Sequence, residues 1–209
     1  MKYGYFLSLS PLLLATALFT GVGEKPESPV DSTVDVGVTV NGVKWATRNV
    51  ATPGHFVDKP EDTGMFYQWN NKTGWSSTDP AINSDGNTIW DNTEAAGTVW
   101  EAANDPCPDG WRVPAQDELE SLAKSGSEWT SQTSVNGSTF GSGNSTVFFP
   151  VTGCRDYSNG TVNTGNFGRY WSSTANGAYA RSLTFTGNYV NSDITNFRAY
   201  GFSVRCVAE

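Results

Sequence analysis

The stretch that decides the fold closes the domain: residues 201–207, GFSVRCV. It follows the β pattern and predicts a strand over 202–207. Its counterpart lies near the start of the domain, where residues 38–47, VTVNGVKWAT, predict a β-hairpin around Asn41-Gly42. An Asn-Gly pair supplies the positive φ angles of a type I′ turn. With a strand at each end of the domain, we expect the N- and C-terminal strands to pair.

The chain between these strands is rich in loops. Residues 53–92 show little periodicity, but Trp69, Trp75 and Trp90 stand there among Gly, Asn, Ser and Pro. We expect these aromatic side chains to pin the loops to a core. Further elements are predicted as follows: a short helix over 98–103 and strands over 147–149, 170–173 and 178–186. The predicted fold class is therefore α+β, loop-rich, with one or two short helices.

The clearest helix covers residues 114–124. Pro114 opens it and Gly126 closes it, and the acidic Asp117 and Glu118 favour the positive end of its dipole. A single apolar stripe on this segment predicts that one of its faces packs on the core.

The N-terminus has the features of an export signal. Lys2 precedes an almost uninterrupted apolar run from Phe6 to Phe19, which is too short to span a bilayer. Val22 occupies the position of the acylated Cys in a lipobox, which argues against a lipid anchor. We expect an exported protein, secreted or at the cell surface, with no membrane insertion after signal removal. The predicted division of the chain is a signal peptide over 1–23, a polar linker over 24–36 and a globular domain over 37–209.

Composition and motifs argue against nucleic-acid binding and against catalysis. The formal net charge is −8 and there is no basic run, so a polyanionic partner is not expected. His55 is the only histidine, and the motifs of hydrolases, redox dithiols, zinc sites and phosphate-binding loops are absent from the sequence. Asp91, Asp105 and Asp109 lack the alternation of a calcium loop and are interpreted as turn carboxylates. We predict no catalytic residue, no cofactor and no metal site.

Three cysteines leave the disulfide pairing open. Export makes a disulfide possible, and a bridge between Cys107 and Cys206 would close a long loop. We favour this pairing, with Cys154 free or buried as a small apolar residue.

The clearest anomaly is compositional and lies in residues 154–207. Residues 24–153 contain five Lys, eight Glu, three Gln and one Met, and at that density residues 154–207 should hold about seven of these four types. They hold none, and also no His and no Pro. One interpretation is genetic: an Asn codon AAC randomised at both adenines yields Asn, Thr, Ser, Tyr, Asp, Ala, Arg, Phe, Ile, Gly, Cys and a few others, but not Lys, Glu, Gln, Met or Trp. The alternative is that Asn/Gly/Thr-rich β-loops simply avoid long charged side chains.

Five blocks of the sequence belong to a recognisable pattern. They are residues 41–50 (NGVKWATRNV), 64–69 (GMFYQW), 104–114 (NDPCPDGWRVP), 170–173 (YWSS) and 201–207 (GFSVRCV). Together they resemble the Fibrobacter succinogenes major paralogous domain, over about residues 38–207. The resemblance implies a C-type lectin-like fold. It also implies kinship with the variable proteins of diversity-generating retroelements, in which adenine-directed mutagenesis rewrites a C-terminal ligand-binding segment.

Three residues depart from this pattern. Ala115 stands where a helix-capping Thr is usual, which removes a cap but not the fold. Cys154 stands where an aromatic residue is usual, and Val22 replaces the lipoprotein Cys.

The resemblance assigns two kinds of position in the variable region, residues 154–207. Scaffold positions are Leu183, Phe185, Val190, Arg198, Gly201 and Phe202. Candidate ligand-binding positions are Asp156, Tyr157, Phe167, Arg169, Thr184, Thr186, Asn188, Tyr189, Asn191, Asp193, Thr195, Asn196, Phe197 and Tyr200. On a strand, Leu183 and Phe185 point to one face and Thr184 and Thr186 to the other, so we expect one exposed binding face. Its residue types are also those of antibody paratopes.

The predicted function is ligand binding without catalysis, directed at a protein or glycan on a cell or phage surface. One alternative is a carbohydrate-binding lectin that uses calcium or the Trp-rich loops. However, seven of the eight Trp precede residue 130 without regular spacing, which favours core packing, and we expect Trp45, Trp111 and Trp171 in the core. A further alternative is an enzyme resembling the formylglycine-generating enzymes, which needs an active-site cysteine pair near the C-terminus.

Overall fold

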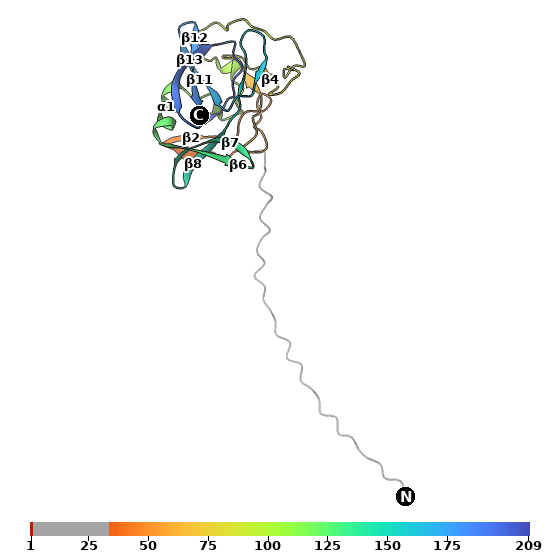
Figure 1. Cartoon of the computed structure of the whole chain (residues 1–209), viewed down its shortest axis with the longest axis vertical. Coiled ribbons are helices and arrows are strands. Elements are labelled where there is room, and N and C mark those ends of the chain that lie inside the picture. The colour runs from red at the N-terminus through yellow and green to blue at the C-terminus, as the bar shows by residue number, and fades with distance from the viewer. Residues whose placement is uncertain (2–33) are drawn as a thin grey trace. The chain divides into compact units, whose positions relative to one another are not determined.

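The computed structural model describes residue 1 and residues 34–209 (Figure 1). The chain divides into a unit of residues 1–31 and a unit of residues 32–209, and the helices and strands of the described residues all belong to the second unit. The predicted signal peptide, apart from Met1, and residues 24–33 of the predicted linker lie outside the described residues. In the described part of the chain, no helix has the length and apolar character needed to cross a bilayer.

A four-stranded antiparallel sheet joins the two ends of the domain. Its order is β1 (Val38–Val40), β2 (Val43–Trp45), β14 (Val207–Ala208) and β5 (Trp111–Arg112). Asn41 and Gly42 form the β1–β2 turn with φ of 48° and 81°, as a type I′ turn requires. Val207 pairs with both Trp45 and Arg112. The predicted pairing of the N- and C-terminal strands is therefore confirmed.

The strand predicted over 202–207 is shorter than expected. Only its last residue belongs to β14, and the residues before it make single bridges to three different segments: Gly201 to Arg155, Phe202 to Tyr67, and Ser203 to Tyr170. Residues 201–207 are all buried, so their alternation of apolar and polar residues does not mark a strand with one exposed face. The segment crosses the interior of the domain instead of pairing along one neighbour.

A disulfide joins Cys107 to Cys206, as predicted, with the two Cα atoms 6.1 Å apart. Cys154 is free and buried. The bridge spans 99 residues of sequence, and closing a loop of that size stabilises a fold by about 4–5 kcal/mol in the chain-entropy model.

The predicted helix is confirmed as α1 (Gln116–Lys124), with Ala115 at its N-cap. Ala115 has no side-chain oxygen to cap the helix, but Glu118 Oε2 accepts from its backbone N–H at 2.7 Å and Thr174 Oγ1 accepts from that of Gln116 at 3.0 Å. Leu119 and Leu122 are buried in the core. The short helix predicted over 98–103 is a 3₁₀ turn, η1 (Ala102–Asn104).

Two three-stranded antiparallel sheets form the rest of the scaffold. One consists of β6 (Ser127–Gln132), β7 (Val135–Ser142) and β8 (Ser145–Pro150). The other consists of β11 (Gly168–Asn176), β12 (Tyr179–Phe185) and β13 (Val190–Phe197), with α1 against it (Figure 1). The predicted strands over 147–149, 170–173 and 178–186 fall in β8, β11 and β12.

The remaining strands are two-residue pairs: β3 (Phe66–Tyr67) with β4 (Gly74–Trp75), and β9 (Cys154–Arg155) with β10 (Val162–Asn163). With one α-helix and several small sheets the domain is α+β and mostly β.

The core consists of two clusters that meet at β11. Trp171 belongs to the cluster beneath the loops, and Trp45 belongs to the cluster between α1 and β8, and both side chains are fully buried as predicted. Trp111 is only partly buried and packs against the first of these clusters without being one of its buried members. Its strand β5 lies at a sheet edge, where the ring packs edge-on against Phe56 with Lys44 above it.

Two buried arginines attach the loops of residues 66–100 to the C-terminal segment. Arg198 donates to the carbonyl oxygens of Ala95 and Gly97 and stacks over Trp69, with 4.2 Å from its guanidinium carbon to the ring centroid. Arg155 donates to the carbonyl oxygens of Ser76 and Thr78. The loops are therefore held by hydrogen bonds to the region predicted to bind ligand.

Candidate ligand-binding face

The candidate positions on β13 form a regular exposed row. Asn191, Asp193, Thr195 and Phe197 are exposed, and the residues between them are partly buried. This is the period of two that a strand imposes when one of its faces is covered. Arg181 on β12 makes an ion pair with Asp193, and Asn176 on β11 donates to Thr195 Oγ1 at 3.1 Å.

At the end of this row the aromatic rings gather. Tyr157 stacks on Phe197 with 4.6 Å between centroids and meets Tyr200 edge-on at 4.9 Å. Tyr179, paired with Phe197 across β12 and β13, has its ring 5.1 Å from that of Phe197. The exposed fractions of Tyr179 and Phe197 are 41% and 38%. Aromatic rings from three segments of the chain, at residues 157, 179 and 197–200, therefore lie together at the surface.

Arg169 lies beside these rings. Its guanidinium carbon is 4.7 Å from the ring centroid of Phe167, 5.4 Å from that of Phe202 and 5.9 Å from that of Tyr200. We call the following set the aromatic face: Tyr157, Phe167, Arg169, Tyr179, Phe197 and Tyr200. All of its members lie between residues 154 and 207.

The pKa values of two groups at this face, the Tyr200 hydroxyl and the neighbouring Cys154 thiol, are raised, which favours their neutral forms. Burial raises the pKa of the Tyr200 hydroxyl, and the nearby Asp156 carboxylate raises it further. Burial also raises the pKa of the Cys154 thiol, although Arg169 opposes the shift. Neither group is activated as a nucleophile.

The structure separates a second group of candidates from the aromatic face. Thr186, Asn188 and Tyr189 lie at the β12–β13 turn, where they line a hollow of about 250 Å³ against Trp129. With about 3.3 Å per residue, strand β13 places Tyr189 about 25 Å from Phe197. The predicted positions thus form two clusters joined by the β13 row.

Two candidate positions do not fit the predicted exposed face. Thr184 is buried, because β12 is the central strand and Thr184 is flanked by Arg169 on one side and Asn191 on the other. Its hydroxyl has no hydrogen-bond partner in the described chain. Asn196 is partly buried and donates to Ser182 Oγ at 2.9 Å. The expected alternation does not expose Thr184, because both faces of β12 are covered near this residue.

Sequence reasoning missed two residues of this region, Tyr179 and Arg181. Both lie on the strand predicted over 178–186, and both belong to the window with the unusual composition. Simple alternation would not have identified them, because Tyr179 and Arg181 have the same parity as the buried Leu183 and Phe185. The pairing of β12 with β13 shifts register between Ser182 and Thr184. The register to β13 that brings them to Phe197 and Asp193 was not predictable, because β13 itself was not predicted.

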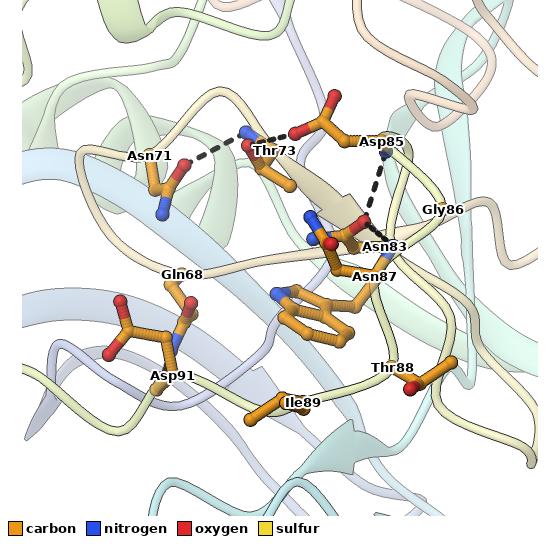
Figure 2. Close-up of a pocket in the computed structure, with 11 residues that line it drawn as sticks. Gln68, Asn71, Thr73, Asn83, Asp85, Gly86, Asn87, Thr88, Ile89 and Asp91 are labelled. Atoms are coloured by element: carbon orange, nitrogen blue, oxygen red, sulfur yellow. Dashed lines mark hydrogen bonds between the residues drawn. The ribbon is translucent and has the colours of Figure 1, made fainter.

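A separate cleft of about 470 Å³ lies in the loops of residues 68–91 (Figure 2). Polar side chains surround it, but many of their atoms are used within the loop. Asn83 Oδ1 accepts from the backbone N–H of Asp85 at 3.0 Å and of Asn87 at 2.8 Å. Trp75 is buried and packs against Trp90 with 4.8 Å between centroids and the ring planes tilted by 51°. This Trp therefore forms the floor of the loop and not an open stacking platform.

The aspartates considered for calcium lie in turns. Asp105 accepts from the backbone N–H groups of Cys107 at 2.8 Å and Val113 at 3.0 Å, and Asp91 accepts from that of Thr93 at 3.0 Å. Within residues 34–209, no three His, Cys, Asp or Glu residues are placed to hold a metal ion.

Comparison with known proteins adds one match. Residues 125–207 match a family described as a domain of unknown function, DUF8237. The matched segment runs from the end of α1 to β14 and includes the whole aromatic face. No curated protein and no solved structure matches the chain.

Proposed function

We propose that this chain is an exported, non-enzymatic ligand-binding protein with a C-type lectin-like fold, and that its aromatic face and the β13 row contact the ligand. The ligand is a protein or glycan on a cell or phage surface. The observation that carries the proposal is the coincidence of two independent features. The residues that lie together at the surface are drawn from the one window that lacks Lys, Glu, Gln and Met.

The energetics of the face support a binding role. Exposed rings grouped on one surface mark interaction sites more often than isolated exposed residues do. Tyr and Phe bring large contact areas with few rotatable bonds, which is why paratopes and binding hot spots are rich in aromatic side chains. On this face the rings pack against one another, so they are ordered before a ligand arrives and less entropy is lost on binding.

Export is supported by the Cys107–Cys206 disulfide, since such bonds persist mainly in oxidising compartments. The C-type lectin-like fold is supported by the pairing of the terminal strands and by the link between the two cysteine blocks.

The test is a screen followed by replacement. A library of surface proteins and glycans is screened with the wild-type chain to obtain a ligand. Tyr157, Tyr179, Phe197 and Tyr200 are then replaced together by Ser or Asn, which AAC randomisation also produces. We expect a cooperative melting transition with loss of the ligand. Unchanged affinity in a folded variant would overturn the proposal, and so would loss of the fold.

A second candidate function is sugar binding in the loop cleft. The observation that favours it is the ring of amide, hydroxyl and carboxylate groups around a space of about 470 Å³ (Figure 2). A glycan array probed with the wild type and with Asn87→Ala and Asp91→Ala tests it. Glycan binding lost in these variants, but kept in the aromatic-face variant, would favour this function.

A further inference from the structure

We infer that Arg169 is an anchor for an oxyanion of the ligand, a carboxylate or a phosphate group, within the aromatic face. The inference rests on the proposed function, because it specifies the chemistry of the group that this face receives.

Arg169 differs from the other arginines of the chain in its partners. Four of the others make ion pairs, namely Arg48 with Asp35, Arg112 with Glu118, Arg155 with Asp79 and Arg181 with Asp193. The remaining two, Arg198 and Arg205, each donate to at least two backbone carbonyl oxygens. Arg169 has neither kind of partner among residues 34–209. Its single hydrogen bond runs from Nη1 to Cys154 Sγ at 3.7 Å, and a thiol sulfur is a weak acceptor.

The aromatic neighbours of Arg169 do not satisfy its donors. Rings attract a guanidinium electrostatically and pack against its planar faces. The guanidinium N–H groups point outward in the guanidinium plane, so contacts between its faces and the rings leave them free to donate hydrogen bonds. Nε is buried without a partner, whereas Nη2 has no partner in the described chain and is not among its buried atoms. A positive charge with an available donor therefore lies beside the partly buried rings of Phe167 and Tyr200.

Asp156, which acts on Cys154 and Tyr200 together with Arg169, does not neutralise this charge. Asp156 Oδ1 accepts from the backbone N–H of Ser158 at 2.9 Å and from its hydroxyl at 2.5 Å, and no ion pair joins Asp156 to Arg169 in the described residues. Asp156 is nevertheless close enough to influence Cys154 and Tyr200 electrostatically. It should weaken the binding of an anion at Arg169 by repulsion.

These features define the ligand group. Charge-assisted hydrogen bonds from a guanidinium are strongest to planar or tetrahedral oxyanions. The chain as a whole is acidic, with a net charge of −8, so a strongly anionic ligand is repelled at long range. The face therefore suits a ligand that places one carboxylate or phosphate on an otherwise neutral or apolar surface.

The experiment titrates the full exported chain with sodium acetate and, separately, with inorganic phosphate, at constant ionic strength maintained with chloride. The readout is the ¹H–¹⁵N signal of the Arg169 side chain, assigned by its absence in Arg169→Lys. We expect a saturable shift with one anion or both, and the stronger of the two identifies the source of the oxyanion. Asp156→Asn should tighten binding several-fold, while Arg112→Gln, an arginine already paired with Glu118 and outside the aromatic face, should leave it unchanged.

Absence of a saturable shift with both anions overturns the inference, and this result needs no variant that could misfold. Equal loss in Arg112→Gln would also overturn it, because it would indicate a non-specific response to charge. The outcome is distinguishable from failure of the proposed function. If a screened ligand requires Tyr157 and Phe197 but still binds Arg169→Lys and Arg169→Gln, the proposed binding face is retained. Only the role of Arg169 as an oxyanion anchor is then overturned.

Discussion

The loop cleft and the aromatic face differ in how many of their polar groups and rings already have partners within the protein. In the cleft, Asn83 accepts two backbone N–H groups, Asn71 accepts that of Thr73, and the indole of Trp75 is buried against Trp90. The aromatic face contains the exposed rings of Tyr179 and Phe197 and also Arg169, a cation without an oxygen partner in the described chain. In this protein, groups that lack an internal partner therefore indicate a binding site better than a concave surface lined by polar side chains does.

The largest expected effect separates structural from binding aromatics. Trp75→Ala should destabilise the fold by about 3–5 kcal/mol, because it removes a buried ring from the floor of the cleft. Ligand specificity should be unchanged in the folded fraction. Thermal or chemical denaturation measures this, with the exposed Ile89→Ser as control. A loss of only a few tenths of a kcal/mol would show that Trp75 is not structural.

The next effect is on affinity. Phe197→Ala and Tyr157→Ala should each weaken binding of the screened ligand by about 2 kcal/mol or more, as aromatic anchors at binding faces do. Stability should change by less than about 1 kcal/mol, since both side chains are partly exposed. Calorimetry and melting curves on the same samples compare the two quantities. A larger loss of stability than of affinity would assign these rings to the core.

A smaller effect tests the correction at Thr184. Thr184→Val keeps the shape but removes a buried hydroxyl without a partner, so the free energy of unfolding should rise by about 1 kcal/mol. Thr195→Val, on the exposed row of β13, is the matched control and should stay within about 0.5 kcal/mol. Destabilisation by Thr184→Val would mean that its hydroxyl has a partner, such as bound water.

The smallest effect concerns the cleft rim. Asn87→Ala removes a side chain for which the structure shows no hydrogen bond, so stability and ligand affinity should both stay within about 0.5 kcal/mol. Asn83→Ala, by contrast, removes the acceptor of two backbone N–H groups and should cost about 1 kcal/mol in stability. Loss of ligand binding in Asn87→Ala would indicate that the ligand binds in the cleft and not on the aromatic face.

The scaffold was largely predictable because its signals are local. Asn41-Gly42 specifies a hairpin turn, Pro114 and Gly126 bracket α1, and the strands in β8, β11 and β12 carry apolar or aromatic runs. The β6–β7 hairpin was missed because its turn uses Thr133 and Ser134, with φ of 48° and 70°, where glycine or asparagine is expected.

Strand β13 was missed for a different reason: its residues, VNSDITNF, are mostly polar. Its stability comes from pairing with β12, which is a tertiary effect that propensity does not report. The window with the unusual composition was visible in the sequence. The sequence did not reveal that its members form two clusters, because that division depends on the direction and length of β13.

The most direct test of the central claim is a ligand footprint by hydrogen–deuterium exchange on the full exported chain. We predict that a ligand obtained by screening protects the backbone around residues 156–157, 167–169, 179–181 and 193–200, while residues 68–91 exchange as in the free protein. Protection confined to residues 68–91, or to the β12–β13 turn at residues 186–189, would contradict the assignment of binding to the aromatic face.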